Sequence, residues 1–183
     1  QGCNMIETLL SDQVLVPLLQ RLVRHPSEQT ALQEEDPGIR AFITDCAARE
    51  IEALGLGTGY YDTMGNLILE LGPADADPSV LFATYAMTHP AARMTDPFAA
   101  TLIETPLGAA VRGRGVAEQK TAMTAAFAAI AQAKKDGLRG RIILTVLSAG
   151  ETGRHTAIEA VCSVLGRMPD LAVICLGTDS RIG

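Results

Sequence analysis

The fold is decided by the stretch Gly113-Arg114-Gly115-Val116-Ala117-Glu118-Gln119-Lys120, in which a glycine-rich turn leads directly into a long apolar helix. Glycine on both sides of Arg114 lets the backbone turn sharply before the helix begins. The helix is predicted from about Glu118 to Lys135, and its alanine-rich face is typical of tight packing on a sheet. The apolar run Arg141–Leu147 follows as a buried strand. Helix and strand together indicate an α/β domain.

The rest of the chain continues this alternation. Further strands are predicted at 80–84 and 171–176, a hairpin at 58–62 and 67–71, and two short strands around 106–108. Further helices are predicted up to Val23, from Asp36 to Gly55 and over 156–165. The pattern predicts a mixed, largely parallel sheet flanked by helices, with ligands at the ends of its strands. Those ends are the segments 84–96, 113–118, 148–153 and 177–179.

Composition excludes several classes of partner. The chain has 183 residues, 48% hydrophobic and 20% charged, as expected of one globular domain. Its net charge of −6 comes without any basic run, so nucleic acid and anionic membranes are not expected to bind. The longest apolar stretches fall short of the ~20 residues of a membrane span. Four scattered cysteines suit reduced thiols, and we expect a cytoplasmic protein.

Several motifs occur in an order that resembles one enzyme family. They are residues 22–27 (LVRHPS), 62–67 (DTMGNL), the strand 80–84, 96–98 (DPF), 113–120 (GRGVAEQK) and 149–153 (AGETG). Together they resemble the di-zinc amidohydrolases and peptidases of the aminoacylase, acetylornithine deacetylase, succinyl-diaminopimelate desuccinylase and carboxypeptidase G kind. The resemblance implies that residues 1–183 form the N-terminal part of a zinc-peptidase-like catalytic domain. The dimerisation or lid domain and the C-terminal part are then absent.

The resemblance also implies where a metal site would lie. In this family a water bridging two zinc ions attacks an amide or carbamate carbonyl, with a glutamate as general base. The places of the first histidine and aspartate hold Tyr85 and Met87, which cannot replace them as zinc ligands. The general-base position holds Gly150, and a later acidic position aligns with Gly177, two residues before Asp179. Water activation by the usual route is therefore not expected.

Two carboxylates of the family pattern remain, Glu118 and Glu151. They are candidates for holding one metal ion, although two carboxylates without imidazole make a poor zinc site. His89 and Asp96 lie in the preceding loop and complete a conceivable rearranged site, which His155 could join. The simpler interpretation is that both histidines are exposed loop and helix-cap residues.

Two basic residues of the glycine-rich motif receive simpler interpretations. Arg114 is expected to tie loops together through its fixed donor fork, and Lys120 to be a solvated helix residue or an ion-pair partner.

Three functional hypotheses follow. The first is a pseudoenzyme, a degenerate hydrolase relative without a cofactor that acts as a structural or regulatory subunit. The second is an active hydrolase of an amide, carbamate or peptide C–N bond with a rearranged site, which would use zinc if that site still functions. The third is a small-molecule-binding module in the old substrate cleft. Because the last strand leaves an unpaired sheet edge, we expect a homo-oligomer or a second chain that completes the fold.

Overall fold

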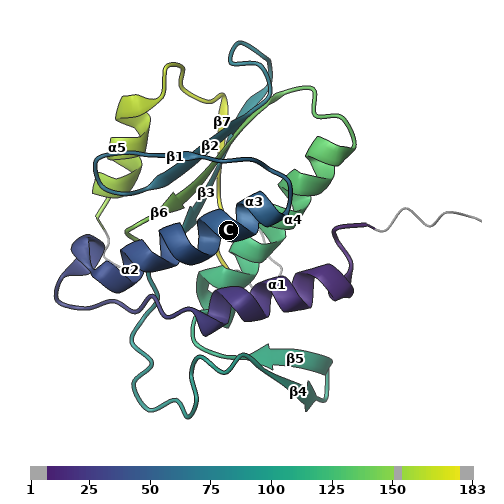
Figure 1. The fold of residues 1–183 in the computed structure, drawn as a ribbon, viewed down its shortest axis with the longest axis vertical. Coiled ribbons are helices and arrows are strands. Elements are labelled where there is room, and N and C mark those ends of the chain that lie inside the picture. The colour runs from purple at the N-terminus through teal and green to yellow at the C-terminus, as the bar shows by residue number, and fades with distance from the viewer. Residues whose placement is uncertain (1–7, 151–153, 178–183) are drawn as a thin grey trace, which may run out of the picture.

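The computed structural model describes residues 8–150 and 154–177, which form a five-stranded sheet and a separate hairpin. The order of strands in the main sheet is β1-β2-β6-β3-β7 (Figure 1). Their bounds are β1 (Tyr60–Tyr61), β2 (Leu67–Leu71), β3 (Ser79–Tyr85), β6 (Arg141–Leu147) and β7 (Leu171–Ile174). β3 is parallel to both β6 and β7, whereas β2 is antiparallel to β6 and to β1. The predicted mixed, largely parallel sheet is confirmed.

β3 and β6 each lie between two other strands of the sheet, and most of their side chains are apolar. Residues 141–146 of β6 are all buried, and β6 pairs with β3 along seven positions, from Ser79↔Arg141 to Tyr85↔Leu147. A strand buried on both faces is typical of parallel sheets covered by helices on each side. The carboxyl ends of β3, β6 and β7 therefore meet at one edge of the sheet.

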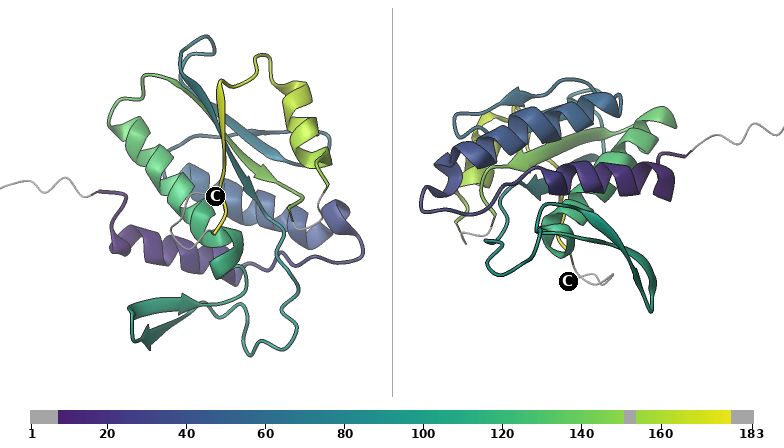
Figure 2. Two further views of the ribbon diagram at one scale, coloured as in Figure 1. Left: turned by 180° about the vertical axis from the view of Figure 1, so that it is seen from behind. Right: turned by 60° about the horizontal axis from the view of Figure 1, so that its bottom comes forward.

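Helices cover both faces of the sheet. Their bounds are α1 (Asp12–Arg24), η1 (Gln33–Glu35), α2 (Pro37–Ala41), η2 (Phe42–Ala47), α3 (Ala48–Ala53), η3 (Val116–Lys120), α4 (Thr121–Lys135) and α5 (Thr156–Val164). Alternate residues of β6 point to opposite faces. Leu144 joins the main core with α1, α2 to α3 and α4, while Ile143 joins a smaller core under α5. Seen from behind, α5 and β7 come to the front (Figure 2, left).

The predicted helix from Asp36 to Gly55 is continuous but irregular. The Asp36 carboxylate accepts a hydrogen bond from the Gly38 amide at 2.7 Å, as a capping residue before proline should. The middle of this helix, η2, is π-helical, and so is η3 at the start of the long helix. No helix in the described part of the chain is long and apolar enough to cross a membrane.

A two-stranded hairpin, β4 (Thr101–Thr105) and β5 (Gly108–Arg112), projects from the body of the molecule at the bottom of Figure 1. A small apolar cluster joins its base to α1, and it includes Leu19, Val23 and Val111. Sequence analysis predicted both strands. Two strands are marginal without further packing, so this contact with α1 holds the hairpin in place.

The connection between β3 and β4 is irregular, as predicted, but it is anchored to the chain after α1. The Thr88 amide donates to the Ser27 carbonyl at 2.9 Å, and the Gln29 amide donates to the Thr88 carbonyl at 2.7 Å. The Ser27 hydroxyl also donates to the Ala86 carbonyl at 2.6 Å. These bonds fix the backbone immediately after β3, where the candidate site begins.

Candidate site at the carboxyl ends of the strands

Tyr85 is the last residue of β3 and lies directly beside the end of β6. It pairs with Leu147, and the Ala86 amide donates to the Leu147 carbonyl at 2.8 Å. Residues 148–150 therefore leave β6 next to the Tyr85 side chain. The structure thus brings together Tyr85, which sequence analysis placed at a former zinc-ligand position, and Gly150, which it placed at the general-base position.

The Tyr85 ring occupies the space next to Gly150 where a side chain would stand. A Cβ atom built on Gly150 would lie 2.0 Å from Cδ2 of Tyr85, and 2.5 and 2.6 Å from Cγ and Cε2. Separations of this size are far below van der Waals contact, so no residue larger than glycine fits here unless the ring moves. The Tyr85 ring can take this position because residue 150 is a glycine and has no side chain.

Met87 is fully buried rather than directed to a polar site. It belongs to the main core, together with Phe42 and Met123. Its carbonyl accepts a hydrogen bond of 2.6 Å from Nε2 of Gln119, which also donates to the Ala86 carbonyl at 3.2 Å. Gln119 thereby ties the start of the long helix to the backbone after β3. Sequence analysis did not identify this contact.

Both carboxylate oxygens of Glu118 already have donors. Oε1 accepts from Nη1 of Arg114 at 2.5 Å, and Oε2 accepts from the backbone amide of His89 at 3.0 Å. The Arg114 amide also donates to the Pro97 carbonyl at 2.7 Å. Arg114 thus connects loops, as expected. Its charge neutralises the one carboxylate of the family pattern that the structure describes.

Gly177 follows β7 and lies against the start of the long helix. Its amide donates to the Glu118 carbonyl at 2.8 Å. A Cβ atom at this position would lie 2.4 Å from the carbonyl oxygen of Ala117 and 2.9 Å from that of Glu118. An acidic side chain at 177 would require a shift of the backbone.

The remaining candidate ligands are not gathered into a metal site by the residues that the structure describes. His89 and Asp96 are exposed in the loop after β3, and His155 is exposed before α5. Glu151 and Asp179 lie outside the described residues. Among residues 8–150 and 154–177, no group of three or more His, Cys, Asp or Glu side chains is placed to hold a metal ion. The donors within these described residues do not by themselves fit a di-zinc centre.

Lys120 is fully buried, so the prediction of a solvated or ion-paired residue was wrong. Nζ donates to the carbonyls of Leu22 and His25, at 2.9 Å each, and lies 4.6 Å from the centre of the Phe42 ring. Burial lowers the pKa of Lys120 to about 8. The sequence did contain a signal, because Lys120 shares the helix face of Met123 and Phe127, three and seven residues later.

Asn66 is a buried residue that supports the site from the hairpin β1–β2. Its Oδ1 accepts from the amide and the hydroxyl of Ser148, at 2.8 and 3.0 Å. Its Nδ2 donates to Asp62 at 2.7 Å and to the Ala157 carbonyl at 3.1 Å. One amide therefore holds the hairpin, the end of β6 and the start of α5 together. Sequence analysis identified this motif as a hairpin turn and as part of the family resemblance, but not the bridge that Asn66 makes.

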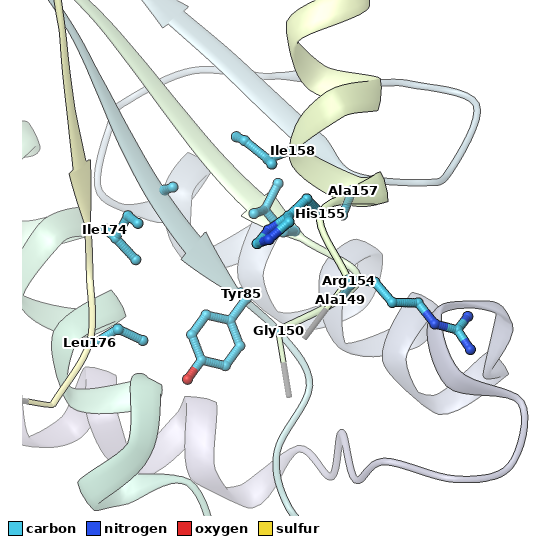
Figure 3. Close-up of a pocket in the computed structure, with 11 residues that line it drawn as sticks. Tyr85, Ala149, Gly150, Arg154, His155, Ala157, Ile158, Ile174 and Leu176 are labelled. Atoms are coloured by element: carbon cyan, nitrogen blue, oxygen red, sulfur yellow. The ribbon is translucent and has the colours of Figure 1, made fainter. Parts of the chain in front are cut away.

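A pocket of about 380 Å³ opens between β7 and α5, beside Tyr85 (Figure 3). Its lining consists of Ala83, Tyr85, Leu147, Ala149, Gly150, Arg154, His155, Ala157, Ile158, Ile174 and Leu176. Most of these side chains are apolar, and the rings of Tyr85 and His155 are its principal polar features. Figure 3 shows the Arg154 side chain running away from this space.

Solved structures of known proteins share this fold. An M20 family metallo-carboxypeptidase from Sulfolobus solfataricus superposes with a TM-score of 0.70 and 20% identity, covering 88% of this chain and 37% of its own. Human carnosine dipeptidase 1 superposes with a TM-score of 0.65 and 20% identity, and the match covers 89% of this chain and 38% of the dipeptidase. A tripeptidase from Staphylococcus aureus superposes with a TM-score of 0.64 and 17% identity, and the match covers 91% of this chain and 43% of the tripeptidase.

The sequence itself matches no protein-family model and no curated protein. The chain spans about two-fifths of the length of these solved relatives. We conclude that this chain has the fold found in metallopeptidases of the M20 kind.

Proposed function

We propose that this protein is a catalytically degenerate relative of the M20 metallopeptidases. It does not carry out the usual di-zinc hydrolysis and acts as a structural, regulatory or small-molecule-binding subunit. The observation that carries the proposal is the Tyr85 ring, which fills the space of a side chain at position 150. A carboxylate general base at 150 and this ring exclude each other.

The surrounding contacts support the same conclusion. A water nucleophile has to be deprotonated by a group within hydrogen-bonding reach, and glycine offers none. Glu118 is engaged by Arg114, and position 177 has no room for an acidic side chain. Tyr85 and buried Met87 offer a phenol and a thioether where imidazole and carboxylate are needed. A shared fold does not supply the chemistry that these residues lack.

The test measures metal content and hydrolysis on the same native, untagged protein. Elemental analysis by inductively coupled plasma mass spectrometry is expected to find well below one zinc, manganese or cobalt ion per chain. N-acyl amino acids and dipeptides are expected to remain intact, with or without added zinc, under conditions in which an active M20 peptidase turns them over.

The rival hypothesis, an active hydrolase with a rearranged site, predicts the opposite results. Stoichiometric metal and metal-dependent turnover would overturn the proposal if Glu118→Gln abolished both. The matched control is Glu104→Gln, which removes a carboxylate from the exposed hairpin strand β4. It should leave either result unchanged.

A further inference from the structure

The pocket between β7 and α5 has the form of a ligand site. Its floor is formed by Ala83 of β3 and by Leu147 and Ala149 at the end of β6. Ile174 bounds it on the β7 side and Ile158 on the α5 side (Figure 3). We propose that this pocket binds a small neutral aromatic molecule that carries one hydrogen-bonding group.

The apolar body of the ligand follows from the floor and walls. Side chains two residues apart on a strand share a face, so Ala83 and Tyr85 line the same side of the sheet. The hollow exists because alanine and glycine form much of its base, while larger aliphatic side chains stand around it. An apolar group of matching size removes this surface from water, which is favourable.

The aromatic character follows from two rings that reach the pocket from different elements. Tyr85 comes from the end of β3 and His155 from the start of α5 (Figure 3). The Tyr85 ring is held in place because the Gly150 backbone lies against it. A fixed ring offers a stacking surface at little cost in side-chain entropy. The imidazole of His155 supplies a partner for one polar group of the ligand.

The neutral charge follows from the charged groups around the pocket. None of the lining residues that the structure describes is a carboxylate, so these residues give a bound cation no counter-charge. Among the described lining residues, Arg154 alone is permanently charged, and its side chain runs away from the pocket (Figure 3). Nη1 of Arg154 lies 3.8 Å from a carboxylate oxygen of Glu34.

The inference rests on the proposed function only in treating this region as a binding site rather than a di-zinc centre. Binding and hydrolysis are measured separately. Absence of binding in a metal-free, inactive protein would overturn the inference alone. Metal-dependent hydrolysis would overturn the proposed function whether or not the pocket binds.

The experiment titrates the full chain with 4-methylphenol and follows binding by calorimetry. We expect saturable binding of one molecule per chain. Two probes of similar size test the ligand class: 4-methylcyclohexanol lacks the aromatic ring and 4-methylbenzylamine is a cation. Each is expected to bind at least fivefold more weakly. Equal affinity for all three, or no saturation by 4-methylphenol, would overturn the assignment.

Two variants locate the binding. Ala83→Leu fills the floor, and Ile174→Trp fills the β7 side from a position that is 69% exposed and therefore tolerant of substitution. Both should lower the affinity at least tenfold. Leu102→Trp introduces the same ring on the hairpin, far from the lining residues, and should change nothing. Unchanged affinity in the folded Ile174→Trp variant would place the binding elsewhere.

Discussion

At the scale of single residues, the candidate site depends on Tyr85 and Gly150. They are 65 positions apart in sequence, yet the ring of one lies where the side chain of the other would stand. Changing either residue alone therefore creates a misfit. A single return to a family-like glutamate at 150 would place the new side chain inside an aromatic ring.

We expect Gly150→Glu to lower the free energy of unfolding by about 1–3 kcal/mol, the usual cost of forcing extra atoms into occupied space. Adding Tyr85→Ala should relieve the clash. The loss in free energy of unfolding in the double variant should then be smaller than the sum of the losses in the two single variants, by about 1 kcal/mol or more. Urea unfolding of the four proteins measures this coupling.

The control for this cycle is Gly166→Glu, because a Cβ atom at Gly166 has nothing within 4 Å. It should cost little and show no coupling to Tyr85→Ala. Additive effects of the substitutions at 85 and 150 would contradict the contact between them.

At the scale of elements, Lys120 joins the start of the long helix to the end of α1. Its ammonium group caps the carbonyls of Leu22 and His25, where α1 runs out of its own donors. The contact places η3, and with it Glu118, against the strand ends. A lysine at this position acts as a buried connector between elements.

Lys120→Met should lower the free energy of unfolding by about 2 kcal/mol at pH 7, because two carbonyls lose their donor. The cost should grow with pH. Burial lowers the pKa of Lys120 to about 8 in the folded protein, whereas an unfolded lysine keeps its proton to about pH 10.4. Between these values the unfolded wild-type chain binds more protons, so wild-type stability rises with pH relative to the variant.

Denaturant unfolding at pH 7 and pH 9.5 measures this difference. Lys134→Met is the matched control, since Lys134 also donates to two carbonyls, those of Gly55 and Leu56, but from an exposed position. Its cost should be smaller. A difference in free energy of unfolding between wild type and Lys120→Met that is smaller at pH 9.5 than at pH 7 would contradict the assignment of the buried ammonium.

At the scale of the whole molecule, β7 forms one edge of the described sheet. Among residues 8–150 and 154–177, β7 pairs with β3 alone, and Leu171, Val173 and Ile174 are 59%, 37% and 69% exposed. No charged residue interrupts the strand. An apolar edge with free backbone groups readily accepts another strand.

We expect the chain to self-associate through β7 at micromolar concentrations, as the predicted oligomer requires. Val173→Lys places a charge on this edge, on the face opposite the pocket, and should leave a monomer. Leu102→Lys, on an exposed position of the hairpin, should behave like wild type. Analytical ultracentrifugation over a hundredfold range of concentration decides between these outcomes. A wild-type protein that stays monomeric throughout would remove the prediction.

The sequence by itself determined the order and type of the elements. The apolar runs of β3 and β6, the Asp36 cap and the glycine-rich turn before the long helix all act over a few residues, so local pattern reveals them. Through the family resemblance it also predicted that Tyr85, Met87 and Gly150 stand at positions where the family has other residues.

Only the tertiary structure decided which residues from distant segments contact one another. The contact of Tyr85 with Gly150, the buried position of Lys120 and the bridge made by Asn66 each join segments distant in sequence. Such contacts depend on strand order and helix packing rather than on local propensity. The physical reason is that close packing lets two side chains compete for one volume only after the sheet has placed them side by side.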